Sequence, residues 1–246
     1  MAELIFVHGA WHGGWYFSEV GAQLRSLGHR VHAPDLPGIG NLDNYLEVIT
    51  RVLTSLNEPA ILIGHSQGGV VMTAAAERLP HLVNGLIYVS AFLPTHGQSI
   101  NDILRLHKLN VPLPYLTVDR ERQVTYANTD VMEEYLFHDC PPEVWASARE
   151  RLRAEPIALS KDSVAVTPER AGRIPRAYVE CLQDRAIPLN LQRAMVAAAP
   201  CAVVASLDCG HMPFYSQPQE LAALLDRLSA ELTSAKVRAS QTQTDS

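Results

Sequence analysis

Residues 60–69 read AILIGHSQGG, and the expected architecture follows from this short stretch. Its first four residues form an apolar run with the length of a buried strand. Gly64, Ser66 and Gly68 then match the pattern G-x-S-x-G, and the run VVMTAAAERL continues as an apolar helix. A serine on a sharp strand-to-helix turn is exposed at the edge of a parallel sheet. The context predicts that Ser66 is a nucleophile, the alternative being a glycine-rich turn that only packs tightly.

Short apolar runs on both sides of this turn predict the other strands of the sheet. They lie at residues 4–7, 29–33, 86–89, 177–181 and 202–206. Segments with apolar residues at helical spacing separate them, at residues 15–27, 43–56, 189–199 and 218–233. Strands that alternate with helices in this way form right-handed βαβ units. The chain is therefore expected to be an α/β protein, with a mostly parallel sheet flanked by helices.

The strand–helix alternation stops between residues 94 and 173. This stretch contains scattered prolines and charged helical pieces such as EVWASARERLRAE, without strong strand signals. Because the alternation resumes afterwards, we expect a mainly helical cap (residues 94–173) inserted after the strand near 86–89. Residues 1–93 and 174–233 then form one core, and the polar residues 234–246 are expected to be a disordered tail. The alternative for the insert is a separate helical domain.

Composition excludes several classes of protein. The 246 residues carry 20 basic and 26 acidic side chains, a net charge of −6, whereas nucleic-acid binders are usually basic. No apolar run is long enough for a transmembrane helix, and the first residues lack the pattern of a secretion signal. We therefore expect neither nucleic acid nor membrane as a partner, and a monomer or homodimer in the cytoplasm.

The four cysteines show no paired CxxC spacing, which indicates reduced thiols. Cys201 and Cys209 are eight residues apart, so a bridge between them is the alternative.

A serine nucleophile needs a base, and the base needs an acid that orients it. On folds with this turn the chain order is serine, acid, histidine. His211 is the candidate base, because it alone follows the last predicted strand; His81, His96, His107 and His138 lie elsewhere. Asp184 follows the penultimate strand and is the candidate acid. Asp208, three residues before His211, and Asp102 are its rivals.

Acyl transfer also needs donors for the oxyanion that forms on the carbonyl. The backbone N–H of Gln67, directly after the serine, is one candidate. The loop after the first strand, His8-Gly9-Ala10-Trp11, provides the other through the Ala10 N–H. We expect His8 to brace this loop rather than to transfer protons.

These pieces together resemble the α/β-hydrolase superfamily over the whole chain except its tail. The matching segments are FVHGAWHGGW, APDLPGIG, GHSQGG, QDRAIP and GHMPF. Within the superfamily they look like the branch of plant methylesterases, hydroxynitrile lyases and small bacterial esterases. The resemblance implies an α/β-hydrolase fold and a carboxylesterase-type serine hydrolase with a small-molecule ester as substrate. Lactonase, cyclase or carbon–carbon hydrolase chemistry, and slow-turnover ligand binding, are the alternatives.

Two positions separate this chain from the lyases of that branch. The lyases carry a threonine where this chain has Ala10 and a lysine where it has Met212. Haloalkane dehalogenases and epoxide hydrolases resemble the fold too, but carry an aspartate in place of Ser66. The resemblance therefore favours ester hydrolysis, which requires no cofactor, and no metal-ligand cluster is visible in the sequence.

The substrate pocket is expected to be apolar and rich in aromatic residues, which favours a hydrophobic ester over a charged one. Its candidate lining residues are Trp11, Phe92, Tyr115, Tyr126, Phe137, Trp145, Ile187 and Met212.

Overall fold

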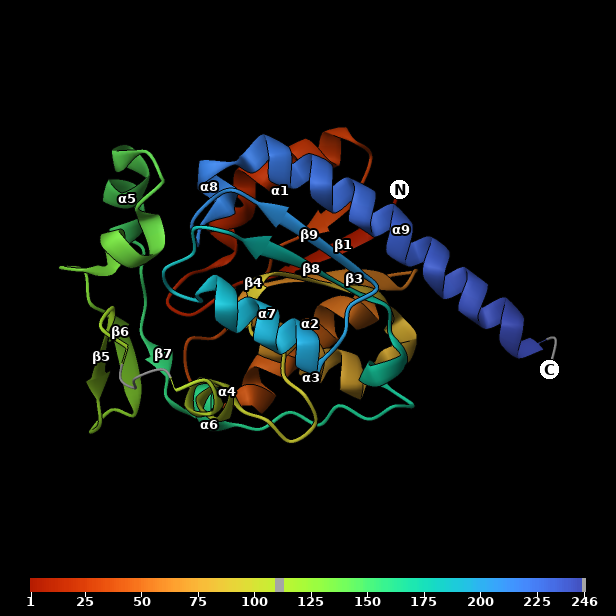
Figure 1. Ribbon diagram of the computed structural model, residues 1–246, viewed down its shortest axis with the longest axis horizontal. Helices are drawn as coiled ribbons and strands as arrows, with labels where there is room; N and C mark the ends of the chain where they lie inside the picture. The colour runs from red at the N-terminus through yellow and green to blue at the C-terminus, as the bar shows by residue number, and fades with distance from the viewer. Residues whose placement is uncertain (109–112, 245–246) are drawn as a thin grey trace.

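A six-stranded parallel sheet forms the centre of the protein (Figure 1). The structure is a computed structural model that describes residues 1–108 and 113–244, with side chains up to residue 236. The strand order is β2-β1-β3-β4-β8-β9. Their bounds are β1 Glu3–Val7, β2 Arg30–His32, β3 Ala60–Ser66, β4 Val83–Ala91, β8 Arg176–Cys181 and β9 Val203–Leu207. The six predicted strands and their parallel arrangement are confirmed.

Helices cover both faces of the sheet, as Figure 1 shows. One face packs against α1 (Ser18–Ser26) and α9 (Pro218–Thr244), and the other against α2 (Leu42–Ser55), α3 (Gly68–Arg78) and α7 (Leu189–Ala198). The central strands are apolar without alternation because each is buried on both faces. The flanking helices are amphipathic: α2 buries its Leu42, Tyr45, Leu46, Ile49 and Leu53 side.

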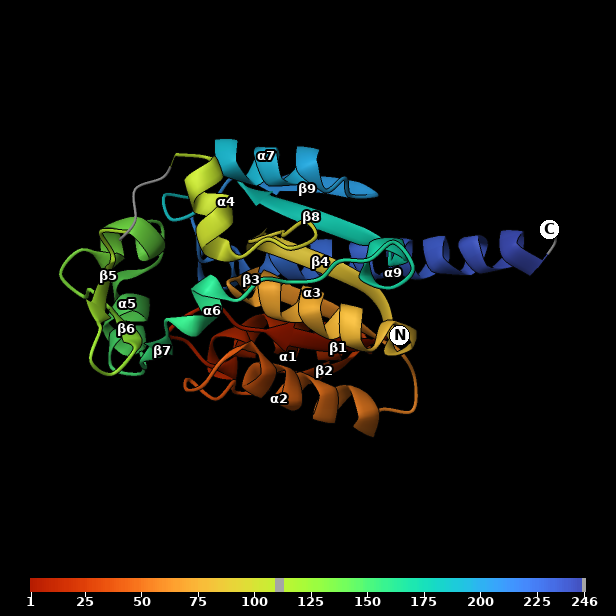
Figure 2. The same ribbon diagram turned by 90° about the horizontal axis from the view of Figure 1, so that it is seen from below.

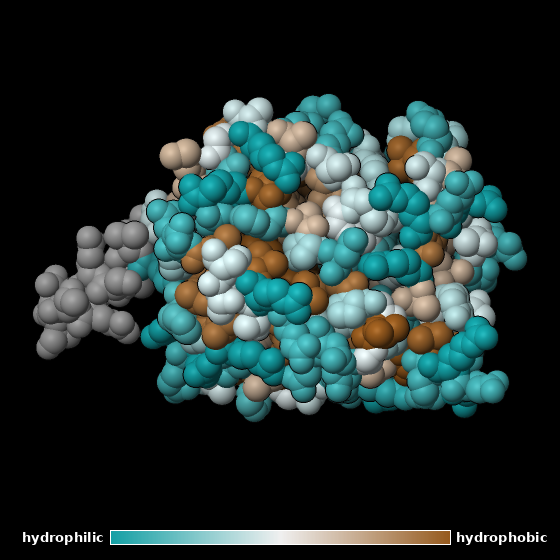
Figure 3. Space-filling model, turned by 180° about the vertical axis from the view of Figure 1, so that it is seen from behind, coloured by the Kyte–Doolittle hydropathy of each residue, from teal (hydrophilic) through white to brown (hydrophobic). Residues whose placement is uncertain are grey.

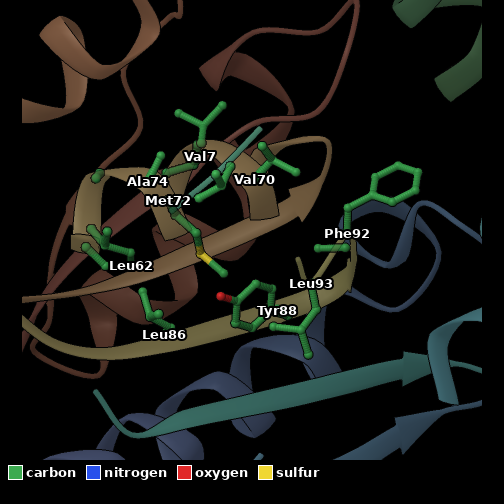
Figure 4. Packing of buried hydrophobic residues seen from close by; sticks show 14 of the residues in the cluster. Val7, Leu62, Val70, Met72, Ala74, Leu86, Tyr88, Phe92 and Leu93 are labelled. Atoms are coloured by element: carbon green, nitrogen blue, oxygen red, sulfur yellow. The ribbon is translucent and has the colours of Figure 1, made fainter. Parts of the chain in front are cut away.

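Helix α3 is the exception, because it is buried nearly all round. Figure 4 shows Met72 reaching from α3 towards Tyr88 of β4, with Leu62 and Leu86 beside it. Phe92, at the end of β4, points away from this group. Helix α3 therefore fixes the strand-to-helix turn that precedes it.

The chain between β4 and β8 corresponds to the cap expected at residues 94–173. Most of it lies beyond the carboxyl ends of the sheet strands (Figure 2), whereas its last part returns along the core, where the Ala171 N–H donates to Glu77 of α3. It contains α4 (Ile100–Leu106), α5 (Pro142–Arg149) and α6 (Ala158–Lys161), with a π-helical turn at Glu133–Phe137 and a 3-10 turn at Ala171–Arg173. It also contains a small antiparallel sheet of β5 (Leu116–Asp119), β6 (Val124–Ala127) and β7 (Glu155–Pro156).

The cap was expected to be mainly helical without strong strand signals, and it contains three short strands beside its helices. Strands β5 and β6 have four residues each and are mostly half-buried or exposed on both sides, so neither shows an alternating apolar pattern. The predicted helical piece at residues 143–155 ends as a helix at Arg149, and its last residue, Glu155, lies in β7.

Helix α9 continues to Thr244, beyond residue 233 where the helical spacing in the sequence was expected to end. Three short elements belong to the core as well: 3-10 turns at Gly14–Phe17 and Pro80–Leu82, and α8 at Pro213–Ser216. In the described part of the chain, none of the helices has the length and apolarity needed to cross a bilayer.

Hydrophilic residues cover most of the face opposite to that of Figure 1, with apolar residues visible between them (Figure 3).

The turn between β3 and α3 depends on a close approach of two backbones. A β-carbon at Gly68 would overlap the carbonyl oxygen of Val7 in the neighbouring strand β1. A β-carbon at Gly64 would lie 2.7 Å from the Met72 sulfur of α3. Only glycine fits where a helix start packs this tightly against a strand.

Gly68→Ala should therefore destabilise the protein, lowering its free energy of unfolding by about 2 kcal/mol, the usual cost of forcing one extra carbon into a packed site. Gly21→Ala in α1 is the matched control, because its nearest neighbour outside the helix would lie 3.4 Å away. The control should be neutral or stabilising by roughly 0.5–1 kcal/mol. Urea unfolding measures both, and equal stability of the two variants would contradict the explanation.

Candidate active site

Ser66 lies at the end of β3 in a strained conformation. Its φ of 52° is in the left-handed region, which residues other than glycine rarely adopt. A β-carbon at Gly9 would lie 2.8 Å from the Ser66 β-carbon, so the loop after β1 runs directly beside the serine. Such strain is stored where the surrounding structure imposes it, typically at functional sites.

His211 and Asp184 form a buried pair. Nδ1 of His211 donates to Oδ2 of Asp184 at 2.6 Å, and both residues are almost completely buried. The second oxygen of Asp184 accepts the backbone N–H groups of Ala186 (2.7 Å) and Ile187 (2.8 Å). Ser90 donates its hydroxyl to Oδ2. These hydrogen bonds hold the carboxylate in one orientation. The imidazole of His211, which donates to this carboxylate, is therefore held as well.

Ser66, His211, Ala10 and Gln67 all line one cavity of about 550 Å³. Among the described residues, the Ser66 hydroxyl makes no hydrogen bond, either to His211 or to another group. Catalytic hydrogen bonds are often long before substrate binds. Within the same set of residues, the backbone N–H groups of Ala10 and Gln67 also donate to nothing. The cavity therefore joins an exposed hydroxyl, a paired imidazole and two unused donors.

A second histidine connects the loops around the cavity. Nε2 of His65 donates to the carbonyl oxygen of His211 at 2.8 Å, so its Nδ1 accepts from the Tyr16 hydroxyl at 2.9 Å. That hydroxyl accepts the N–H of Gly9 at 3.1 Å. Burial lowers the pKa of His65 well below its ordinary value, which keeps the ring neutral as this chain of bonds requires.

His8 braces the loop after β1, as expected. Its Nδ1 donates to the carbonyl oxygen of Gly9 (2.9 Å), and its Nε2 accepts the N–H of Leu36 (2.9 Å). His12 donates in the same way to the carbonyl oxygen of Ala10 at 2.7 Å. Burial lowers the pKa of His8 to about 4 and that of His12 to about 3. Both rings therefore hold backbone rather than exchange protons near neutral pH.

The rival acids and bases lie outside this arrangement. Asp208 is exposed and accepts from the Gln183 side chain at 2.9 Å. Asp102 accepts from Ser99 in the capping box at the start of α4. His81 and His96 are exposed, whereas His107 and His138 are half-buried, and these four do not line the cavity.

Half of the expected pocket residues line the cavity: Trp11, Phe92, Tyr115 and Ile187. The other four, Tyr126, Phe137, Trp145 and Met212, do not line it. Tyr126 points outwards with 37% of its surface exposed. The other three are buried in the core cluster on the α1–α9 side of the sheet: Phe137 and Trp145 of the cap pack against each other and against this cluster, and Met212 lies in the loop before α8.

Glu155 is a cavity residue that sequence reasoning missed, because it ends a piece that reads as a charged helix. It is 3% exposed and accepts hydrogen bonds from the Tyr45 hydroxyl (2.7 Å), the Gln67 side chain and the Trp11 N–H (3.3 Å). Burial raises its pKa to about 7. Ser90 and Tyr16 were missed for a different reason: nothing in their local pattern distinguishes them from core residues.

This fold and this arrangement of loops agree with the family comparison. Residues 4–224 match the Alpha/beta hydrolase family, and the chain belongs to that family. A pyrethroid hydrolase of Sphingobium wenxiniae is 31% identical over 240 residues, covering 90% of this chain and 85% of that protein. Methylesterase 7 of Arabidopsis thaliana is 29% identical over 247 residues, covering 91% and 94%. The crystal structure of a pyrethroid hydrolase from Sphingobium faniae JZ-2 superimposes with a TM-score of 0.85 at 27% identity, covering 93% of this chain and 97% of that one.

The buried histidines predict a loss of stability in mild acid. His8, His12 and His65 stay neutral in the folded protein, whereas the unfolded chain protonates them below their ordinary pKa of 6.5. Glu155 acts in the opposite sense, because its folded pKa of about 7 lies above its ordinary 4.5. Unfolding then takes up a net two protons (three minus one). The free energy of unfolding should fall by about 3 kcal/mol per unit as the pH decreases from about 6 to about 5.

Urea unfolding at these two pH values and at about pH 7.5 measures this effect. A free energy of unfolding that stays constant from neutral pH to pH 5 would show that the rings are not held neutral.

Proposed function

We propose that this protein is a serine hydrolase that cleaves carboxylic esters through an acyl-serine intermediate. The observation that carries the proposal is the cavity in which the strained Ser66 faces the same space as the His211–Asp184 pair and two unused backbone donors. The names of the relatives, methylesterases and pyrethroid hydrolases, support the same reaction class.

Acylation uses each of these groups in turn. His211 removes the proton from the Ser66 hydroxyl through Nε2, because its Nδ1 proton is donated to Asp184. The serine oxygen attacks the ester carbonyl, and the N–H groups of Ala10 and Gln67 bind the resulting oxyanion. One such donor contributes roughly 10²–10³ to the rate. When the tetrahedral intermediate collapses, the carbon–oxygen bond to the alcohol breaks, and His211 gives its proton to that alcohol.

Deacylation repeats the sequence with water as the nucleophile. His211 takes a proton from water, the hydroxide attacks the acyl-serine, and the same two N–H groups bind the second oxyanion. Collapse releases the carboxylic acid, and the proton returns from His211 to Ser66. Asp184 stays ionised throughout and stabilises the imidazolium in each half of the reaction.

The cavity favours a hydrophobic ester of small or moderate size. Its volume lies within the roughly 300–1,000 Å³ of small-molecule sites. Trp11, Phe92, Tyr115 and Ile187 provide apolar walls. Ala10 has only a methyl group, and Met212 is buried away from the cavity, so neither polar side chain of the cyanohydrin lyases is present. The proposed compartment is the cytoplasm, where the free thiols of the four cysteines stay reduced.

Ser66→Ala should abolish hydrolysis of a p-nitrophenyl ester, with kcat falling by about 10⁶, as for loss of a triad nucleophile. Ser229→Ala is the matched control, because Ser229 is a buried serine of α9 whose hydroxyl has no partner among the described residues. The control should keep wild-type activity. Residual activity of Ser66→Ala close to wild type would refute the nucleophile. A stable ligand complex with negligible turnover in wild type would instead indicate a ligand receptor.

The acyl preference is tested with two esters that differ by one carboxylate, p-nitrophenyl butyrate and p-nitrophenyl hemisuccinate. The neutral ester should have a kcat/KM at least about tenfold higher, because the charged one must lose its hydration against apolar walls and beside the buried Glu155. The cations of the lining, Arg120 and Lys161, are the groups that a preference for the hemisuccinate would implicate. A preference for the hemisuccinate would overturn the assignment of a hydrophobic substrate.

A further inference from the structure

The cap reaches into the core through one buried carboxylate, that of Glu155. It lies on β7 and accepts from residues of three different core segments: the Tyr45 hydroxyl of α2, the Gln67 side chain at the start of α3, and the Trp11 N–H of the loop after β1. Two of these residues, Trp11 and Gln67, are the direct neighbours in the chain of Ala10 and Ser66. Glu155 thus contacts both sides of the place where the oxyanion forms.

The loop that carries the Ala10 donor is held in a strained shape. Trp11 has a φ of 63°, a conformation that costs roughly 1–3 kcal/mol in a bulky residue. Its N–H donates to Glu155, and its carbonyl oxygen accepts the N–H of Arg153 at 2.8 Å. The indole donates to Thr125 at 3.1 Å, and the Thr125 hydroxyl donates to the carbonyl oxygen of Glu155 at 3.3 Å. The cap therefore contacts Trp11 on its N–H, its carbonyl and its ring.

We propose that Glu155 is a positioning residue of the oxyanion hole, holding the Trp11 peptide and the Gln67 side chain so that the N–H groups of Ala10 and Gln67 point at one site. This inference rests on the proposed function. Glu155 acts through the residues that it orients and takes no proton from the substrate.

The chemistry of the contacts explains why this position carries a carboxylate. Three donors converge on its two oxygens, and the ionised carboxylate, which dominates above its pKa of about 7, accepts on both without offering a donor in return. A glutamine of the same size would place an NH₂ group against at least one of the donors. Burial raises the pKa of Glu155 to about 7, because the charged form is disfavoured inside the protein. An apolar side chain of the same size would avoid this cost to the stability of the fold. What the carboxylate provides in return is a fixed orientation of the loop after β1.

Glu155→Gln tests the inference, with Glu180→Gln as the matched control. Glu180 is also a buried carboxylate, 5% exposed, that accepts from Arg193 and Ser206, but it does not line the cavity. Glu155→Gln should lower kcat for p-nitrophenyl butyrate by roughly tenfold to hundredfold, less than the roughly 10²–10³ for removal of a donor. KM should change by less than about threefold, because the substrate-binding walls are unchanged. Glu180→Gln should keep kcat within about twofold of wild type.

A readout specific to the oxyanion separates positioning from a general structural role. A trifluoromethyl ketone adds to the serine and places a charged oxygen in the oxyanion hole. Its inhibition constant should therefore rise in Glu155→Gln by the same factor by which kcat/KM falls. Titration to completion with a fluorophosphonate counts the folded, reactive serines and corrects for any misfolded fraction.

A second variant keeps the test decisive if Glu155→Gln folds poorly. Gln67→Met removes the side chain that donates to Glu155 but keeps the backbone N–H. It should lower kcat in the same direction, and the double variant with Glu155→Gln should lose less than the product of the two single losses.

The inference is overturned if Glu155→Gln keeps its kcat, if only KM rises, or if the ketone binds as tightly as to wild type. A wild-type protein whose ester hydrolysis does not depend on Ser66 would refute the proposed function itself, and this inference with it. With Ser66-dependent hydrolysis established, the Glu155 variants decide only the positioning role.

Discussion

The chain turns through the left-handed region at Ser66, and the packing around that turn constrains the rest of the structure. Strand β3 ends there and α3 begins two residues later, with Gly68 pressed against the Val7 carbonyl of β1. The turn cannot relax, because α3 is buried nearly all round and fixed against the sheet. The strain at Ser66 is therefore offset by the packing of a whole helix, which leaves the serine hydroxyl facing the cavity.

Buried polar side chains then connect the loops that meet at this edge of the sheet. His65 links the His211 carbonyl to Tyr16, and Tyr16 accepts from Gly9. Each of these groups has its partner, which a buried polar network needs if it is to specify a geometry rather than weaken it. Because the rings of the network are neutral, they fix the backbone at neutral pH without bringing a charge close to His211.

The cap adds a third layer of constraint, because it contacts the loop after β1 as well as lining the cavity. Its small sheet places Thr125 and Glu155 against Trp11, so the shape of the loop after β1 depends on residues that are more than a hundred positions away in the chain. Under the proposed function, substrate selection and oxyanion geometry are for this reason physically linked. A change in the cap that shifts β7 would alter both the pocket walls and the contacts of the Ala10–Trp11 peptide.

Local sequence patterns determined the alternation of strands and helices, the parallel sheet and the turn at Ser66, because burial on both faces, helical spacing and the G-x-S-x-G pattern are all visible within a few residues. The order of segments also indicated the loops of Asp184 and His211. Only the tertiary structure decided that Ser90 donates to Asp184, that Glu155 contacts Trp11 across 144 positions, and that Phe137 and Trp145 pack into the core instead of the cavity. These contacts depend on how the cap packs on the core. Neither residue spacing nor hydrophobic period encodes such a contact, since both describe only which side of an element is buried and not what it is buried against.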